Sequence, residues 1–145
     1  MELKFQVQLK IRKPAAEVFD AVVDNRKLSG YFVQTSSGPL AAGSTVIWKF
    51  DEHPVDLEVV VGEVVQNEKI VFEWPTGGDY STRVEMIFTP LDAGSTMVQI
   101  AEGVWHEDAK GLAGSYGNAG GWMHMMCCLK AYLEYGINLR AGGAK

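Results

Sequence analysis

The feature that most constrains the fold is a series of five segments between Gly43 and Trp105 in which apolar and polar residues alternate. These segments are STVIWKF, VDLEVVVGEVVQ, KIVFEW, TRVEMIFTPL and STMVQIAEGVW. A period of two is typical of strands that bury one face. The connections DEHP, NE, PTGGD and DAG are short and consist of good turn formers. Neighbouring strands joined so closely run antiparallel, so the sequence predicts an antiparallel meander.

Further elements are predicted on both sides of the meander. Residues 3–11 alternate strictly and predict a first strand, which PAAEVFDAVV and DNRKLSGYF follow as two short helical segments. A short strand near residues 32–35 is a further possibility. From Gly121 onward the apolar residues recur at helical spacing, which predicts a long C-terminal helix whose buried stripe is Trp122, Met126, Leu129 and Leu133, with Met125 and Tyr132 on its flank. The segment HEDAKGLAGSYGNAGG at 106–121 is glycine-rich and aperiodic, and we interpret it as a mobile loop with at most one helical turn that gates access to the interior.

This order of elements predicts an α+β domain. A curved antiparallel β-sheet of six or seven strands would wrap around the long C-terminal α-helix, with two short helices after strand one. A chain of 145 residues suits one domain. We place this domain at residues 1–140 and expect a disordered tail at residues 141–145.

Charge and hydropathy exclude several classes of function. The formal charge of −5 comes from scattered carboxylates, and no window gathers enough Lys and Arg to bind nucleic acid. No apolar run approaches the roughly 20 residues of a membrane span, and MELKFQVQLKIRKP lacks the apolar centre of a signal peptide. The two cysteines, Cys127 and Cys128, are adjacent and cannot easily bridge. We therefore expect a cytoplasmic protein with reduced thiols.

Several segments of the chain resemble a known superfamily. They are IRKPAAEVFDAVVDNRKLSGYF, GPLAAGSTVIWKF, NEKIVFEWP, TPLDAGSTMVQI and GGWMHMMCCLKAYLEYGINLR. Together they resemble the START-like, helix-grip superfamily (SRPBCC, birch-pollen-allergen-like), and within it the branch of activator of heat-shock-protein ATPase homologues. The resemblance covers nearly the whole chain and implies the helix-grip fold. Because the superfamily includes lipid carriers, plant hormone and allergen proteins and polyketide cyclases, the resemblance does not fix a function.

The family name alone does not imply a co-chaperone. In the chaperone activator such a domain is one half of a larger protein, and we expect this chain to lack the additional domain that docks on a chaperone. A co-chaperone-like interaction module therefore stays a third alternative that only the name supports. We expect no chaperone partner and either a monomer or a homodimer.

The resemblance also implies a cavity, because a strongly bent sheet cannot meet its helix everywhere. Such a cavity would bind a small hydrophobic or aromatic molecule, for example a lipid, a polyphenol or a polyketide-like compound. Strand alternation and the helical stripe predict its lining residues, which are Trp48, Phe50, Phe72, Trp74, Val84, Met86, Phe88, Trp122, Met126 and Leu129. The alternative is that the same residues form an ordinary filled core.

Two residues are weak candidates for catalysis. Glu102 faces inward if the alternation of its strand continues, but the adjacent Gly103 favours a bulged or frayed strand end that leaves Glu102 in solvent. His106 lies in the one compact acid/base cluster, HED, and could act as a general base. Consecutive residues rarely present their side chains to one another, so a polar start to a short helical turn is the interpretation of HED that we favour. An enzyme of polyketide cyclase or dehydratase type is therefore the alternative to a binding protein.

The stretch GGWMHMMCCLKAYLEYG at 120–136 raises the question of a soft-metal site. His124 and Cys128 are four residues apart on the predicted helix and could reach one ion. The other sulfur side chains point around the whole helix, and no CxxC or HxxxH elsewhere supplies further ligands. We interpret the stretch as core packing, with Met as a flexible gap-filler. We expect neither a metal nor a cofactor, and we expect His53, in the DEHP turn, to lie in solvent.

Overall fold

The computed structural model of the protein describes residues 1–141. Its elements in chain order are β1 (Leu3–Ile11), α1 (Ala15–Val23), α2 (Asn25–Leu28), β2 (Thr35–Ser36), β3 (Thr45–Lys49), β4 (Leu57–Val65), β5 (Lys69–Pro75), β6 (Ser81–Asp92), β7 (Ser95–Trp105) and α3 (Ala109–Tyr135). The predicted α+β helix-grip fold is confirmed. Of the predicted tail at 141–145, residues 142–145 lie outside the described residues.

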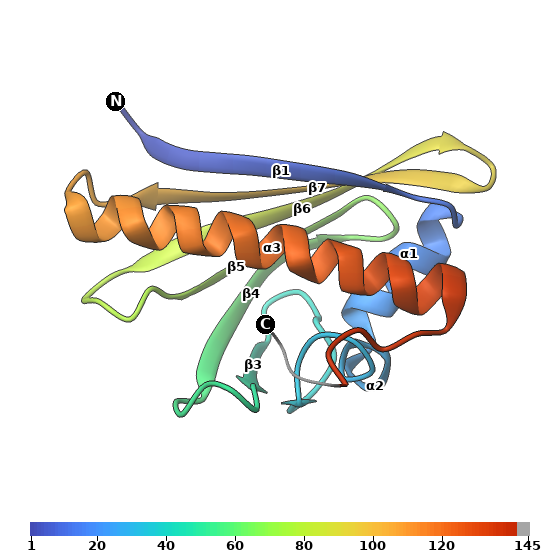
Figure 1. Ribbon diagram of the computed structural model, residues 1–145, viewed down its shortest axis with the longest axis horizontal. Helices are drawn as coiled ribbons and strands as arrows, with labels where there is room; N and C mark the ends of the chain where they lie inside the picture. The colour runs from blue at the N-terminus through green and yellow to red at the C-terminus, as the bar shows by residue number, and fades with distance from the viewer. Residues whose placement is uncertain (142–145) are drawn as a thin grey trace.

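The strands in this range form one antiparallel sheet of seven strands in the order β1-β7-β6-β5-β4-β3-β2. Figure 1 shows α3 lying along one face of this sheet, with α1 and α2 near the C-terminal end of α3. The register shifts within β4 between Val61 and Val64, where one extra residue bends the strand. Such bends let the sheet curve around the helix.

The core lies between the curved sheet and α3. Alternate residues of β3, β5 and β6 are buried on the face toward the helix, as their period of two predicts. The buried residues of the C-terminal half of α3 are Trp122, Met125, Met126, Cys128 and Leu129. This stripe agrees with the predicted one, except that Leu133 is only partly buried. No helix within residues 1–141 is long and apolar enough to cross a membrane.

The start of α3 differs from the prediction. The helix begins at Ala109, so the prediction of a mobile loop up to residue 121 is wrong. Asp108 caps the helix, because its side chain accepts a hydrogen bond of 2.7 Å from the backbone N–H of Gly111. Gly111 and Gly114 pack so closely on the preceding residues that a Cβ would lie 1.9 Å from the His106 carbonyl oxygen and 3.0 Å from the Trp105 ring, respectively. These glycines serve close packing rather than disorder.

The other short elements agree with their sequence signals. Asp24 begins α2 by accepting hydrogen bonds from the backbone N–H groups of Arg26 and Lys27. The short strand expected near residues 32–35 lies slightly later, at Thr35–Ser36, and pairs with β3. Phe32, in the irregular segment before this strand, is buried in the core.

Candidate functional site

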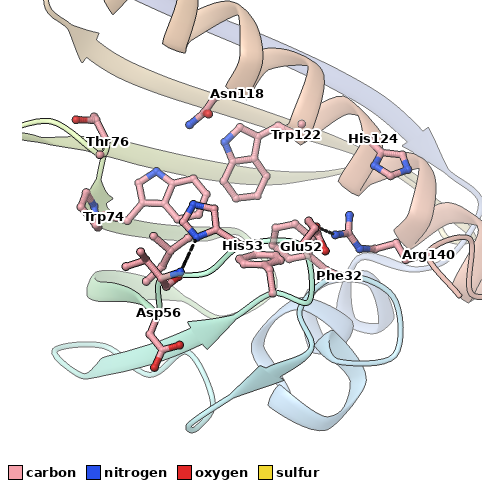
Figure 2. A pocket seen from close by; sticks show the side chains of 16 residues that line it. Phe32, Glu52, His53, Asp56, Trp74, Thr76, Asn118, Trp122, His124 and Arg140 are labelled. Carbon is pink, nitrogen blue, oxygen red and sulfur yellow. Dashed lines mark hydrogen bonds and ion pairs between the residues drawn. The ribbon is translucent and has the colours of Figure 1, made fainter. Parts of the chain in front are cut away.

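A pocket of about 610 Å³ opens between α3, the ends of β3 and β5, and the residues that follow these elements. Figure 2 shows side chains from the helix above and from the sheet and loops below converging on it. Its volume lies in the range of small-molecule sites. The aromatic lining residues are Phe32, Phe50, Trp74 and Trp122, and the polar ones include Glu52, His53, Asp56, Thr76, Asn118, His124 and Arg140.

The four aromatic rings form a continuous wall, although they come from distant parts of the sequence. The Trp74 and Trp122 rings lie 5.2 Å apart between centroids with a tilt of 31°. Phe32 lies 5.7 Å from Trp122 and 5.1 Å from Phe50. Ring pairs at these separations are favourable beyond their buried area. The wall is therefore a packed, rigid surface for an apolar ligand.

Behind this wall lies the carboxylate of Glu102, whose residue is only 1% exposed. It accepts hydrogen bonds from Trp74 Nε1 at 2.9 Å, from Trp122 Nε1 at 2.8 Å and from Thr82 Oγ1 at 2.5 Å. Asn118 Nδ2 donates to both of its oxygens, at 3.1 and 3.2 Å. Three of these four donors line the pocket, whereas Glu102 does not. Glu102 is thus a positioning residue that fixes the aromatic wall.

The interpretation of Glu102 as a solvated residue at a frayed strand end is therefore wrong. Strand β7 stays paired on both sides here, with Glu102 opposite Phe5 of β1 and Val84 of β6. A Cβ at Gly103 would lie 2.6 Å from the Cβ of Lys4, so this glycine allows β1 to approach closely. The expected bulge is present, because the β1–β7 register shifts beside Gly103, between Leu3 and Phe5 of β1, but β7 continues to Trp105 and Glu102 is buried.

Arg140 closes one end of the pocket. It forms an ion pair with Glu52, and its guanidinium carbon lies 6.0 Å from the ring centroids of both Phe32 and Phe50. The Arg140 side chain is 14% exposed, so it is an integral part of the lining. His53 lies in the exposed loop at the pocket and contacts the backbone of Val55 through Nδ1, in agreement with its expected exposure.

The structure divides the ten predicted ligand-binding residues into two groups. Phe50, Trp74 and Trp122 line the pocket. The other seven are buried in the core and do not line it, namely Trp48, Phe72, Val84, Met86, Phe88, Met126 and Leu129. Alternation correctly indicates which side of a strand is buried, but it carries no information on where the interior is filled and where it is open.

Several lining residues were missed because they lie outside regular patterns. Phe32 lies in an irregular segment, Asn118 in a stretch that we expected to be a loop, and Arg140 beside the expected tail. Only Asn118 had a usable signal. It lies four residues before Trp122, a spacing of about one helical turn. No helix was predicted here because the glycines around Asn118 are poor helix formers.

His106 does not take part in the pocket. It is exposed, its ring stacks on that of Tyr80 at 3.6 Å between centroids, and its backbone N–H donates to Tyr80 Oη at 3.1 Å. Asp108 caps α3, as the alternative interpretation of HED as a polar helix start proposed. His106 and Glu102 therefore do not meet at the pocket as an acid/base pair.

The sulfur-rich stretch of α3 faces several directions. Cys127 is exposed and Cys128 is buried, where burial raises the pKa of the Cys128 thiol. Cys128 Sγ lies 3.5 Å from His124 Nε2, so the predicted proximity of this pair is present. Among residues 1–141 no group of three or more His, Cys, Asp or Glu side chains is arranged to hold a metal ion.

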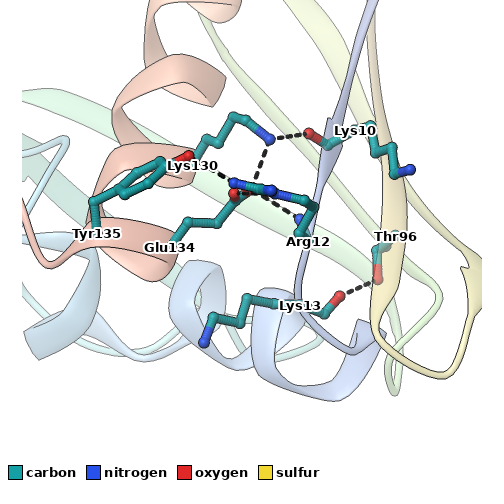
Figure 3. Close-up of polar contacts among 7 residues, drawn as sticks. All are labelled: Lys10, Arg12, Lys13, Thr96, Lys130, Glu134 and Tyr135. Carbon is teal, nitrogen blue, oxygen red and sulfur yellow. Dashed lines mark hydrogen bonds and ion pairs between the residues drawn. The ribbon is translucent and has the colours of Figure 1, made fainter.

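A separate polar cluster anchors the C-terminal end of α3 to β1 (Figure 3). The Glu134 carboxylate, 4% exposed, accepts hydrogen bonds from the Arg12 backbone N–H at 2.8 Å, from Arg12 Nε at 2.7 Å and from Lys130 Nζ at 2.6 Å. Burial by itself raises the pKa of Glu134, but these hydrogen bonds outweigh it and lower the pKa to about 2. The cluster fixes the helix end from which the chain continues to Arg140.

This cluster predicts a dependence of stability on pH. Because the folded pKa of Glu134 is about 2, below its ordinary 4.5, the carboxylate stabilises the fold above pH 4.5 and loses this contribution as the pH falls toward 2. Glu134→Gln should lower the free energy of unfolding at pH 7 by about 2 kcal/mol and flatten its change between pH 4.5 and 2. Urea denaturation at several pH values measures both effects. The exposed Glu2→Gln is the control, and equal pH profiles for Glu134→Gln and the wild type would contradict the assignment.

The curved sheet, the helix that it grips and the pocket between them define a START-like, helix-grip protein. The sequence profile of the activator of Hsp90 ATPase homolog 1-like proteins matches residues 12–134, and the chain belongs to this family. No curated protein matches the sequence at a significant level.

Solved structures with the same fold include three that inform the comparison. The protein SSP2350 from Staphylococcus saprophyticus is 27% identical, with a TM-score of 0.81 over 99% of this chain and 100% of that one. DynU16, from the dynemicin biosynthetic locus, is 22% identical with a TM-score of 0.81, over 94% of this chain but 49% of that one. Aha1 from Colwellia psychrerythraea, solved as a dimer, is 19% identical with a TM-score of 0.77, over 92% and 98% of the two chains. The latter two likenesses concern the fold alone.

Proposed function

We propose that the protein binds a small hydrophobic or aromatic molecule, such as a lipid, a polyphenol or a polyketide-like compound, in the pocket between the sheet and α3. The observation that carries the proposal is the aromatic wall of a pocket of about 610 Å³, held in place by the buried Glu102. Pockets that are mostly apolar, with a few placed polar groups, are typical of small-molecule sites.

An enzyme that uses the same pocket is the second candidate. It is favoured by the structural likeness to DynU16, whose gene locus is biosynthetic. Against it, Glu102 lies behind the aromatic wall and His106 lies outside the pocket, so neither reaches a bound molecule. General acid/base catalysis requires such contact or one bridging water. Binding without turnover is therefore the function that we favour.

Native mass spectrometry of the purified protein, before and after denaturing extraction, tests the proposal. A reproducible additional mass that disappears on extraction would establish a ligand and its class. If the native mass equals that of the polypeptide alone, thermal-shift measurements with fatty acids, flavonoids and sterols follow. A ligand that binds only the folded state raises the melting temperature. The proposal fails if none of these compounds shifts the melting temperature. A product whose mass differs from that of the added compound would show turnover and would favour the enzyme instead.

Replacement of an aromatic lining residue should weaken binding. Phe50→Ala removes a ring that contacts Phe32 and faces the pocket, and we expect the dissociation constant of a bound fluorescent fatty acid to rise about tenfold. Tyr116→Ala is the matched control, because Tyr116 is a 70% exposed aromatic residue of α3 outside the pocket. Fluorescence titration of both variants measures the difference. Equal affinities in the two variants would place the ligand elsewhere.

The oligomeric state and the compartment belong to the same proposal. The dimer formed by Aha1 from C. psychrerythraea makes a homodimer a reasonable arrangement beside the monomer, and light scattering distinguishes the two. The free Cys127 and Cys128 agree with a reducing compartment, and we propose that the protein acts in the cytoplasm. We propose no chaperone partner, and a chaperone recovered in a pull-down would contradict this.

A further inference from the structure

We propose that Gly121 determines the shape of the ligand, because it leaves the backbone of α3 bare at the pocket and so admits a planar aromatic molecule against the helix. This inference rests on the proposed function, since it concerns the same pocket. Gly121 would thus determine which ligands fit because it has no side chain to occupy the pocket.

Helix geometry places Gly121 in the middle of the face that α3 turns toward the pocket. At about 100° per residue, Asn118 and His124 lie about 60° to either side of Gly121. All three residues line the pocket, and Figure 2 shows Asn118 and His124 on the helix above it. A Cβ at position 121 would therefore project into the cavity between these two side chains.

Contact with the rest of the protein does not require a glycine at this position. A Cβ at Gly121 would meet no atom within 4 Å, in contrast to Gly111, where it would collide with the backbone of His106. Gly121 also lies inside a helix, where glycine is a poor helix former. The same open space surrounds Gly117 and Gly120, but of these three glycines only Gly121 lines the pocket, where the missing side chain leaves room for a ligand.

The surroundings of Gly121 indicate the chemistry of the ligand. The adjacent Trp122 is only 2% exposed, and its indole, held by Glu102, packs beside the partly buried Trp74. The bare backbone at Gly121 therefore lies next to the aromatic surface that Trp74 offers to the pocket. Such a surface suits a flat ring system, which can stack on an indole and still lie close to peptide groups. The Asn118 amide and the His124 imidazole lie on either side of Gly121. Asn118 Nδ2 donates to Glu102, so its Oδ1 is the atom that can accept a hydrogen bond from a hydroxyl substituent, whereas the imidazole can bond a hydroxyl or a carbonyl group. The preferred ligand is therefore a planar aromatic molecule with polar substituents.

Two matched pairs of variants test the proposal. They are Gly121→Ala and Gly121→Leu at the pocket, and Gly120→Ala and Gly120→Leu one residue earlier. Gly120 has equally open space but does not line the pocket. The probes are 1-hydroxypyrene, a planar ring system, and cis-parinaric acid, a fatty acid without rings whose saturated carbons next to the carboxyl group can bend around an added side chain. Fluorescence titration measures the affinity, and circular dichroism melting verifies that each variant folds.

We expect both alanine variants to raise the melting temperature by about 3 °C, because alanine is the better helix former. Gly121→Leu should weaken 1-hydroxypyrene binding at least about tenfold and affect cis-parinaric acid less. The Gly120 variants should bind both probes within about twofold of the wild type.

Three results would overturn the inference and leave the proposed function standing. The first is unchanged 1-hydroxypyrene affinity in Gly121→Leu, and the second is an equal loss in Gly120→Leu. The third is a wild type that binds cis-parinaric acid but not 1-hydroxypyrene, which would leave the pocket as a ligand site and remove only the preference for planar molecules. A wild type that binds neither probe would contradict the proposed function itself, and this inference with it.

Discussion

Replacing Glu102 with glutamine is expected to lower the free energy of unfolding by about 3 kcal/mol. The carboxylate accepts from the indole N–H groups of Trp74 and Trp122 on different oxygens. Glutamine retains one acceptor oxygen, so its amide NH₂ must face one of these two indoles. An indole N–H cannot act as an acceptor, and a buried donor is left without a partner. Urea denaturation monitored by tryptophan fluorescence measures the loss.

Glu85→Gln is the matched control for this substitution. Glu85 lies on the neighbouring strand β6, where it is partly exposed and paired with Arg83. We expect a change within about 0.5 kcal/mol, as for most surface ion pairs. If Glu102→Gln were as stable as Glu85→Gln, Glu102 would not hold the aromatic wall. The Glu102 variant should also bind pocket ligands more weakly, because Trp74 and Trp122 lose their common anchor.

Gly111→Ala is expected to destabilise the protein by about 2–3 kcal/mol, although helix propensity alone predicts a gain of about 1 kcal/mol. A Cβ at this position would lie 1.9 Å from the carbonyl oxygen of His106 and 2.9 Å from its carbonyl carbon. These are backbone atoms, so the start of α3 must shift away from β7. The shift would also disturb the cap that Asp108 provides. Thermal and urea denaturation measure the effect.

Gly117→Ala separates packing from propensity in the same helix. Nothing lies within 4 Å of a Cβ at Gly117, so only helix propensity changes and we expect a gain of about 1 kcal/mol. The two substitutions should therefore have opposite signs. A gain in both variants would mean that the N-terminal turn of α3 does not pack tightly on His106.

The strands and the C-terminal half of α3 could be predicted because the periodicity of the sequence reports which side of an element is buried. A strand that buries one face repeats every two residues, and β1, β3 and most of β6 and β7 show this period. A register shift interrupts it in β4, and in β5 Val71 is buried as well as Ile70 and Phe72. The helix from Trp122 onward shows the helical period for the same reason. Short turns then fixed the antiparallel order.

The first half of α3 could not be predicted, because its glycines are poor helix formers and their purpose lies in distant contacts. Gly111 and Gly114 allow the helix to pack on His106 and Trp105. The same limitation applies to Gly103, which suggested a frayed strand but lies against Lys4 of β1. In each case a local propensity pointed one way and tertiary packing required the other.

The sequence by itself therefore determined the fold class, the order of the elements and the faces that they bury. These properties depend on local periodicity and turn chemistry, which are written along the chain. Only the tertiary structure decided where the interior stays open, that Glu102 gathers Trp74, Asn118 and Trp122, and that Arg140 closes the pocket. A cavity is a difference between the space that the backbone encloses and the volume that side chains fill, and this difference depends on how distant segments are packed together.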